Sequence, residues 1–469
     1  MKHYLLYLLC FLNTIYINAQ VFDVETIKLS GDNDKRINLV VLSEGYQNGE
    51  LSKFITDATG FSNAMFTQSP FKEYANYFNV YAIKVPSNES GTDHPDTASD
   101  EGNYTGANDV PVLTADTYFN TSFDTSGIHR ILYTYSSSIV YNVLANNFPE
   151  YDQPIILVNT SIYGGAGGSY ATASTGSSAN EIAIHELGHS LFNLKDEYLL
   201  QDVYYAEAIN MTQETNTSLV KWKNWIGENG INIYPYGSSG VPATWYKPQI
   251  GNKCKMEKLD EPFCSVCKEG IIEKIHSLVS PIDSYLPVSS SVEASTYPID
   301  FQLNLIKPIP NTLKSSWTLN ASNFVNDVDD ISIIESDLNT GTNELTVVIH
   351  DDSPFLKVDN HETTHVYSIN WIITKSALGI DEITSEQNDF NITLFPNPSN
   401  SILNLKVESK NTVNLKVDII SLDGKRLKSI RISNYENNEV DISRLSQGVY
   451  LANFYSNNAL LTSKRFVKN

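Results

Sequence analysis

Residues 181–198 read EIAIHELGHSLFNLKDEY and contain two histidines four positions apart, with a glutamate directly after the first. On a helix, positions i and i+4 lie on one face, one turn apart. His185 and His189 are therefore expected to direct two imidazole nitrogens at one ion, with Glu186 beside it as a general base. Zinc is the expected ion, because neutral imidazoles suit it and catalytic zinc sites keep one position for water. A helical surface with incidental histidines is the alternative for so short a pattern.

The residues around the motif favour the metal site. Gly188 lies inside the helical pattern, where glycine costs about 1 kcal/mol, and this indicates close approach of another backbone. Asn193 tolerates the left-handed conformation that ends a helix. The chain would turn back there and bring Asp196 to the ion as a third ligand, with Glu197 as its nearest rival.

A glycine-rich loop, TSIYGGAGGSYA (160–171), follows the apolar run QPIILVN (153–159). We expect Ile155–Asn159 to be an edge strand that holds an extended substrate by β-addition, with the glycines giving close access to the peptide. A plain flexible connector is the alternative reading of this loop.

These motifs, in this order, resemble metallopeptidase family 64, the IgA-peptidase type. The resemblance rests on HELGHSLFNLKDEY, preceded by VVLSEGY and NTSIYGGAGG and followed by WYKP and CKM…FCSVC, and covers about residues 36–280. It implies a secreted zinc (Zn²⁺) endopeptidase of metzincin-like fold that uses a zinc-bound water. His185, His189 and Asp196 are its implied zinc ligands and Glu186 its implied catalytic base. Met256 would be the methionine beneath the zinc that marks metzincins, although a lone methionine is more often core filler. Family members usually carry glycine where Asn193 stands.

The order of strand-like and helical patterns predicts three folded parts. The runs RINLVVL (36–42) and YFNVYAIKV (77–85) alternate with helical patterns at 50–66 and 130–147, which predicts an α/β (α+β) domain over residues 20–280. Short strands separated by turn residues then predict an all-β, Ig-like sandwich over 281–380. Residues 381–392 are predicted to be a linker, and 393–469 a small β-sandwich with a hairpin turn at Asp423–Gly424.

The last part also differs in charge. Residues 393–469 hold 11 basic and 6 acidic residues, or +5, whereas the whole chain carries −22. The run from Phe395–Pro398 to the terminal KRFVKN closely resembles the sorting domain of the type IX secretion system. This resemblance implies a Gram-negative bacterium, the type IX machinery as a partner, and delivery to the cell surface or the medium. Another Ig-like domain is the alternative.

The opening residues, MKHYLLYLLCFLNTIYINAQ (1–20), predict a signal peptide over 1–19. Lys2 supplies the positive end, and the apolar stretch Tyr4–Ile17 is shorter than the roughly 20 residues of a membrane span. No other apolar run is long enough to span. The charge of −22 disfavours nucleic acid and anionic membranes as partners. The resemblance to a peptidase family implies a protein or peptide substrate.

The cysteines that follow the signal peptide are Cys254, Cys264 and Cys267. In a secreted protein, three cysteines are expected to form one disulfide and leave one thiol. FCSVC also resembles half of a zinc knuckle, but the chain has no second pair, so a disulfide is favoured.

Four further residues receive structural interpretations. His94 is expected in a solvated loop rather than at a calcium site, and His361 and His365 are expected to be strand or loop residues. Tyr246 in WYKP is a candidate oxyanion donor, although a buried structural role is favoured.

Two other functions remain as alternatives to the endopeptidase. One is a catalytically inactive metallopeptidase-like adhesin or glycan- or protein-binding protein, which the long β-rich half of the chain favours. The other is an exopeptidase. The complete set His185, Glu186, His189 and Asp196 argues against the adhesin, because an inactive enzyme need not keep Glu186.

Overall fold

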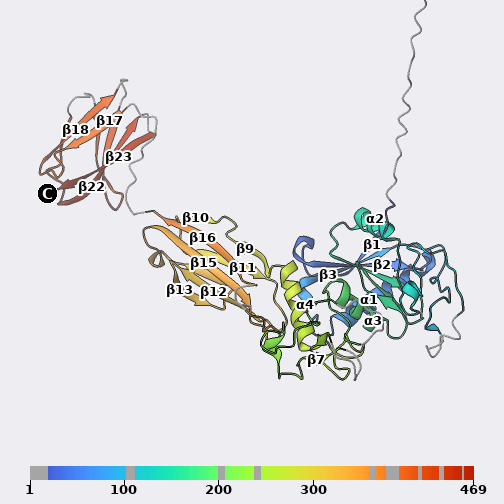
Figure 1. Ribbon diagram of the computed structural model, residues 1–469. Coiled ribbons are helices and arrows are strands. Elements are labelled where there is room, and N and C mark those ends of the chain that lie inside the picture. Colours follow the sequence, from blue (N-terminus) through green and yellow to red (C-terminus); the bar gives the residue numbers. More distant parts are fainter. Residues whose placement is uncertain are drawn as a thin grey trace, which may run out of the picture. The chain divides into compact units, whose positions relative to one another are not determined.

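The computed structural model describes residues 20–101, 111–198, 206–236, 244–359, 365–376, 390–409, 415–432, 438–456 and 459–469. The chain divides into two compact units, of which the first ends at Ile373 and the second begins at Thr374. Figure 1 shows a mixed α/β region in the first part of the chain and β-sheets in the rest. The predicted signal peptide, most of the predicted linker and His361 lie outside the described residues.

A six-stranded sheet lies at the centre of the α/β part, with the strand order β1-β3-β2-β4-β6-β5. The strands are β1 (Asp23–Lys28), β2 (Ile37–Glu44), β3 (Phe78–Lys84), β4 (Gln153–Val158), β5 (Gly165–Ala166) and β6 (Ala171–Ser174). The four inner strands are parallel, and β1 and β5 run antiparallel at the two edges. The inner strands β2, β3 and β4 are almost wholly buried, as is typical of parallel strands covered on both faces.

Helices cover both faces of this sheet. They are α1 (Leu51–Met65), α2 (Ser137–Asn147), α3 (Ala179–Ser190) and α4 (Ser265–Leu278). Successive side chains of a strand point to opposite faces. Leu39 and Val41 of β2 accordingly belong to the core with α1, α3 and α4, whereas Val40 and Leu42 belong to the core with α2. The mixed α/β class predicted for this part is confirmed.

The second predicted helix, 130–147, is shorter than expected, since α2 covers only its last part. Leu132 and Thr134 are buried while the residues between and beside them are more exposed. This alternation indicates extended chain. Ile131 forms a β-bridge with Gly165, so the segment lies against the glycine run instead of coiling.

The expectation that Ile155–Asn159 is an edge strand is wrong. Strand β4 lies between β2 and β6, and the edge is β5, which pairs antiparallel with β6. The continuous apolar run of β4 is typical of an interior parallel strand. The two residues of β5 are too few to produce a periodic pattern in the sequence.

Two β-sheets follow the α/β part. Their orders are β10-β16-β15-β12-β13 and β14-β11-β9. The strands are β9 (Ile282–Leu286), β10 (Ser291–Glu293), β11 (Ile299–Leu305), β12 (Leu313–Leu319), β13 (Ser322–Asn326), β14 (Asp330–Ile333), β15 (Gly341–Asp351) and β16 (Tyr367–Lys375). Both sheets contribute to one core, in which the rings of Trp317 and Trp371 stack with centroids 5.9 Å apart.

Asp351, the last residue of β15, connects these sheets to the α/β part. Its Oδ2 accepts a hydrogen bond from the Tyr74 hydroxyl at 2.6 Å and lies 2.8 Å from His276 Nε2 of α4. Burial raises the pKa of this carboxyl, but hydrogen bonds from His276, Thr312 and Tyr74 outweigh burial and hold the pKa below its ordinary value. The sheets and the α/β part thus share a buried polar junction within the first unit.

The described residues of the second unit form two β-sheets. Its sheets have the orders β17-β18-β21 and β20-β19-β22-β23. The strands are β17 (Phe390–Phe395), β18 (Ile402–Ser409), β19 (Leu415–Ser421), β20 (Arg426–Ile432), β21 (Asn438–Asp441), β22 (Gly448–Ser456) and β23 (Ala459–Lys468). Gly424 has a φ of +81° in the turn between β19 and β20, where the sequence predicts a hairpin.

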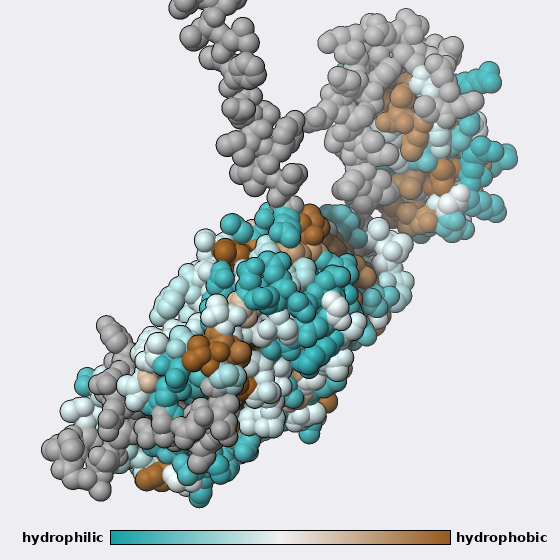
Figure 2. All heavy atoms as spheres, turned by 90° about the vertical axis from the view of Figure 1, so that its right-hand side faces the viewer, coloured by the Kyte–Doolittle hydropathy of each residue, from teal (hydrophilic) through white to brown (hydrophobic). Residues whose placement is uncertain are grey.

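The face drawn in Figure 2 is mostly hydrophilic, with hydrophobic residues in separate small clusters. Scattered apolar residues of this kind are normal on a protein surface. Within the described residues, no helix has both the length and the apolar character needed to cross a membrane.

Candidate metal-dependent active site

Helix α3 presents the two histidines of the motif, and its end determines where the following residues lie. Asn193 adopts the left-handed conformation with a φ of +55°, and its N–H donates to the carbonyl of His189 at 3.2 Å. This is a left-handed cap of the kind that stops a helix and reverses the chain. The chain then returns toward the helix and brings Asp196 to the histidines.

Three ligand atoms converge at this point. His185 Nε2 and His189 Nε2 lie 3.2 Å apart, and Asp196 Oδ1 lies 3.1 Å from the first and 3.2 Å from the second. The structure therefore brings together the three residues that the sequence predicts as metal ligands.

The hydrogen bonds of the histidines make the site fit a cation. His185 Nδ1 donates to the carbonyl of Lys255 at 3.1 Å, and His189 Nδ1 donates to the carbonyl of Leu194 at 2.7 Å. A carbonyl only accepts, so each Nδ1 carries a proton, and the neutral form of each imidazole presents the lone pair of Nε2 to the site. Two lone pairs and a carboxylate oxygen then face one point, and a divalent cation at that point could bind all three.

The electrostatics of the site also favour positive charge at this point. Burial lowers the pKa of His189, but the Asp196 carboxylate more than offsets burial and raises the pKa to about 9. Burial raises the pKa of Asp196, and the two histidines outweigh it and hold that pKa well below its ordinary value.

The backbone around Asp196 decides between it and its neighbour Glu197. The buried Asn210 side chain accepts from the N–H of Lys195 at 2.8 Å and donates to the carbonyl of Lys195 at 2.7 Å. The N–H of Glu197 donates to the carbonyl of Met256 at 2.7 Å. With the chain held on both sides, Asp196 faces the histidines and Glu197 points into the interior, where it contacts cysteines.

Glu186 lies on α3 between the two histidines and lines the same cleft. Burial is the main cause that raises the pKa of its carboxyl, and His185 and His189 partly offset it. A glutamate with a raised pKa is a stronger base, which is the property that proton transfer near neutral pH requires.

The glycine run packs directly against α3. A Cβ on Gly167 would lie 2.5 Å from His189 Cβ and 3.1 Å from Glu186 Oε2, and one on Gly165 would lie 2.5 Å from Ile182 Cγ2. Only residues without side chains allow this approach. The run is thus a packed element beside the site, and the alternative of a plain connector is wrong.

Replacing Gly167 by alanine is expected to lower kcat/KM for peptide cleavage by about 100-fold, because α3 must move and misplacement by ~1 Å has an effect of this size. Gly60→Ala in α1 is the matched control. Its Cβ would meet no atom within 4 Å apart from the local helix backbone, so cleavage should persist and stability should rise by about 0.5–1 kcal/mol. Kinetics and thermal unfolding of both variants check this. Wild-type kinetics in Gly167→Ala would contradict the packing argument.

Met256 lies beneath the motif, and Gly188 is the residue that admits it. A Cβ on Gly188 would lie 3.1 Å from Met256 Sδ. The sequence predicts a close approach at this glycine, but the approaching group is a side chain and not a backbone.

The site opens into a cleft of about 1250 Å³. Tyr198, which ends the quoted motif, lines it, and its ring stacks on His185 at a centroid distance of 6.3 Å. The Arg130 guanidinium lies 5.5 Å from the centre of the Tyr198 ring. Tyr246, the candidate oxyanion donor, lies in β8 (Tyr246–Lys247) and is not among the residues described as lining this cleft. Sequence reasoning missed Arg130 and Asn210, since neither lies near the motif in the chain.

Two histidines that the sequence places in a loop or a strand are buried. His94, expected in a solvated loop, is fully buried, and its Nε2 lies 3.6 Å from Glu101 Oε1 and 3.9 Å from Asp124 Oδ1. The interpretation of His94 as a residue of a solvated loop is wrong. Polar neighbours in the sequence indicate an exposed loop only when their side chains face solvent, and here the carboxylates face the buried histidine. His365 is also buried, with Nε2 3.1 Å from Glu273 Oε1 of α4.

The three cysteines are buried and free, whereas the sequence favoured a disulfide. The sulfurs of Cys254 and Cys267 lie 3.7 Å apart, and a disulfide bond is about 2.05 Å long. Glu197, distant in the sequence, lies among them.

Comparison with known proteins gives two family matches. Residues 25–241 match the model of IgA Peptidase M64, and residues 393–469 match the model of the secretion system C-terminal sorting domain. Comparison with curated proteins gives no match.

Solved structures show only weak likenesses. Dimeric latent PorU from Porphyromonas gingivalis is 13% identical, with a TM-score of 0.15; the match covers 40% of this chain and 20% of that one. The fibronectin(III)-like modules of Clostridium thermocellum CbhA are 16% identical, with a TM-score of 0.14, over 40% of this chain and 93% of that one. Likenesses this weak carry no argument about the fold or the function.

Proposed function

Because the chain carries a peptidase domain of the M64 family and a type IX secretion sorting domain, we propose that it is a secreted, zinc-dependent endopeptidase that cleaves extracellular proteins. The sorting domain indicates delivery to the cell surface or the extracellular space. The observation that carries the proposed chemistry is the convergence of His185, His189 and Asp196 beside Glu186.

In this proposal the two Nε2 atoms and Asp196 Oδ1 hold the zinc ion. Zinc bound there supplies Lewis acidity, which lowers the pKa of water and polarises a carbonyl. Glu186 moves the proton: its carboxylate accepts the proton of the attacking water and passes it to the leaving amine. The carbonyls of Lys255 and Leu194 keep each imidazole in the orientation that binding requires.

The edge strand β5 supports binding of an extended substrate. It lies beside α3 and lines the cleft with Gly165 and Ala166. A peptide that adds to a sheet edge is held by backbone hydrogen bonds along its length. A strand held in this way passes the site without presenting an end, which supports cleavage within a chain over removal of terminal residues.

The remaining architecture is proposed on the same basis. The cap at Asn193, the third ligand after the turn and Met256 beneath Gly188 support a metzincin-like fold for residues 20–280. The two sheets with a shared core support an Ig-like sandwich over 281–380. We also propose that residues 1–19 are the export signal of a Gram-negative bacterium and that 381–392 are the linker to the sorting domain.

The proposed activity is tested with an internally quenched peptide blocked at both ends. The purified protein should cleave it, should lose cleavage after dialysis against a chelator, and should regain it with added zinc. Casein should be cleaved under the same conditions. A protein that binds zinc but leaves both substrates intact would support the adhesin alternative, and cleavage only of unblocked peptides would support an exopeptidase.

Deleting residues 393–469 is expected to leave the protein in the periplasm, because these residues match the sorting domain. Cell fractionation and immunoblotting of the medium, surface and periplasm check this. Lys425→Ala, a substitution at an exposed residue in the turn between β19 and β20, serves as an expression control that keeps the domain. Delivery of the truncated chain to the outside would contradict the role of the second unit.

A further inference from the structure

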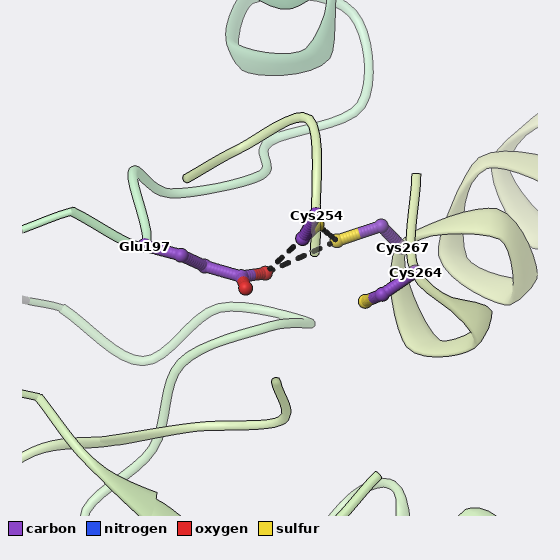
Figure 3. A group of neighbouring side chains, drawn as sticks. All are labelled: Glu197, Cys254, Cys264 and Cys267. Atoms are coloured by element: carbon purple, nitrogen blue, oxygen red, sulfur yellow. Dashed lines mark hydrogen bonds between the residues drawn. The ribbon is translucent and has the colours of Figure 1, made fainter. Parts of the chain in front are cut away.

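Three cysteines and one glutamate form a buried cluster behind the candidate active site. One ligand atom from each of Glu197, Cys254, Cys264 and Cys267 lies within 4.8 Å of the others. Figure 3 shows Glu197 reaching toward the cysteines from one side while Cys264 and Cys267 come from the start of a helix on the other. All four residues are at most 5% exposed.

The cluster gathers separate parts of the α/β domain. Glu197 directly follows Asp196, and Cys254 lies two residues before Met256. Cys264 precedes α4, and Cys267 lies in its first turn. Two cysteines separated by two residues at the start of a helix are a common half of a structural zinc site.

A disulfide between two of the cysteines would not provide partners for all the polar groups of this cluster. Any bond between two of the sulfurs leaves the third thiol beside a buried carboxylate. Glu197 Oε1 lies 3.4 Å from both Cys254 Sγ and Cys267 Sγ, and Glu197 Oε2 has no hydrogen-bond partner among the described residues. The Asn210 side chain donates to Glu197 Oε1 at 2.9 Å, so the costly group is the buried Oε2, which lacks a partner. A divalent cation would bind the carboxylate and all three sulfurs at once.

We propose that Glu197, Cys254, Cys264 and Cys267 hold a second, structural zinc ion. Three thiolates select zinc over magnesium or calcium. Four protein ligands complete tetrahedral coordination and leave no position for water, as in structural sites. The ion binds as the thiols release their protons to solvent, so no oxidant or reductant takes part.

This ion would fix the geometry of the catalytic site from behind. It would join the chain at Glu197, next to Asp196, to the loop of Cys254, whose neighbour Lys255 supplies the carbonyl that orients His185. The proposal does not depend on peptidase activity, because it concerns a separate set of side chains.

The test counts zinc per chain and uses cobalt as a spectroscopic probe. Cys264→Ser/Cys267→Ser should bind one zinc fewer than the wild type and lose the thiolate-to-cobalt charge-transfer absorption of the cobalt-loaded protein. His185→Ala/His189→Ala should also lose one zinc but keep that absorption. Equal zinc in the wild type and the cysteine variant would overturn the proposal.

A measurement on the wild type covers the case in which the cysteine variant does not fold. Under non-reducing conditions, three thiols should resist alkylation in the zinc-loaded protein and all three should react after chelation and unfolding. Only one reactive thiol would show a disulfide and overturn the proposal. Cys267→His, which keeps a zinc ligand, should retain the ion and shift the cobalt spectrum.

A second cluster carries an independent proposal. His94 Nδ1 donates to the carbonyl of Pro111 at 3.1 Å, so its buried Nε2 presents a lone pair. That Nε2 and Asp124 Oδ1 have no hydrogen-bond partner within the described residues, and His129 Nδ1 lies 2.8 Å from Glu101 Oε2. We infer that these two histidines and two carboxylates bind a transition-metal ion such as zinc or manganese, because imidazole ligands disfavour calcium.

The direct test is a crystal of the full chain grown with zinc, or with manganese, measured at the absorption edge of that metal. Anomalous density between His94, Glu101, Asp124 and His129 is expected, and its absence with both metals would overturn this inference. His94→Gln should also bind one ion fewer than the wild type, while Cys264→Ser/Cys267→Ser should keep this ion.

Discussion

Replacing Glu186 by glutamine lowers kcat for peptide cleavage by about 10²–10⁴-fold, the range that a general base contributes. Glutamine keeps the size of the side chain on α3 but accepts no proton. Since His185, His189 and Asp196 are unchanged, the zinc content and the unfolding temperature should equal those of the wild type. Kinetics with the quenched peptide, metal analysis and thermal unfolding measure the three quantities.

Glu207→Gln is the matched control for this substitution. Glu207 lines the same cleft, but its carboxylate pairs with Lys221 and accepts from the N–H of Gln213. Loss of the Glu207 carboxylate should leave kcat unchanged. Full activity in Glu186→Gln would show that another group takes the proton, and loss of zinc in that variant would show that Glu186 acts as a ligand.

Replacing Asp196 by alanine is expected to raise the zinc concentration that half-restores cleavage in metal-depleted protein by at least about 100-fold. Changes in residues that merely support a metal ligand already cost about 10–100-fold, and Asp196 is proposed to be a ligand itself. Asp196 Oδ1 lies 3.1 Å and 3.2 Å from the two Nε2 atoms, so its removal leaves the imidazoles without their anionic partner.

Lys195→Ala and Glu197→Gln distinguish the ligand from its neighbours. Asn210 holds Lys195 through backbone atoms alone, so Lys195→Ala should need no more zinc than the wild type. Glu197→Gln should weaken the cysteine cluster and affect the zinc requirement of cleavage less than Asp196→Ala does. The reverse order of the last two variants would make Glu197 the ligand.

The sequence was sufficient for the central strands and for the residues of the candidate site that lie close together in the chain. Helical spacing places His185 and His189 on one face, and the tolerance of Asn193 for the left-handed conformation predicts the turn that returns Asp196. These are local properties of the backbone, and local sequence patterns report them. The long apolar runs of β2 and β4 could be detected for the same reason. The strands that pair with β4 in the sheet could not be predicted.

Properties that depend on distant contacts could not be predicted. The edge of the sheet is β5, with only Gly165 and Ala166. Two small residues form no sequence pattern that predicts a strand. Glu197 and Cys254 are 57 positions apart, so the cluster exists only after folding. His94 is buried because Glu101 and Asp124 turn inward with it, which a polar loop sequence does not reveal.

The tight packing of the glycine run limits where cleavage preference can arise. The glycine run, with Gly165, Gly167 and Gly168, has no side chains that could contact those of the substrate. Substrate residues that bind along this side of the cleft should therefore vary freely among natural cleavage sites. Selection among substrate sequences then depends on the aromatic side chains of the cleft. Tyr135 and Tyr163 line it and are 78% and 45% exposed, and cleavage sites collected from a digested proteome should be enriched in apolar residues at the positions that meet them.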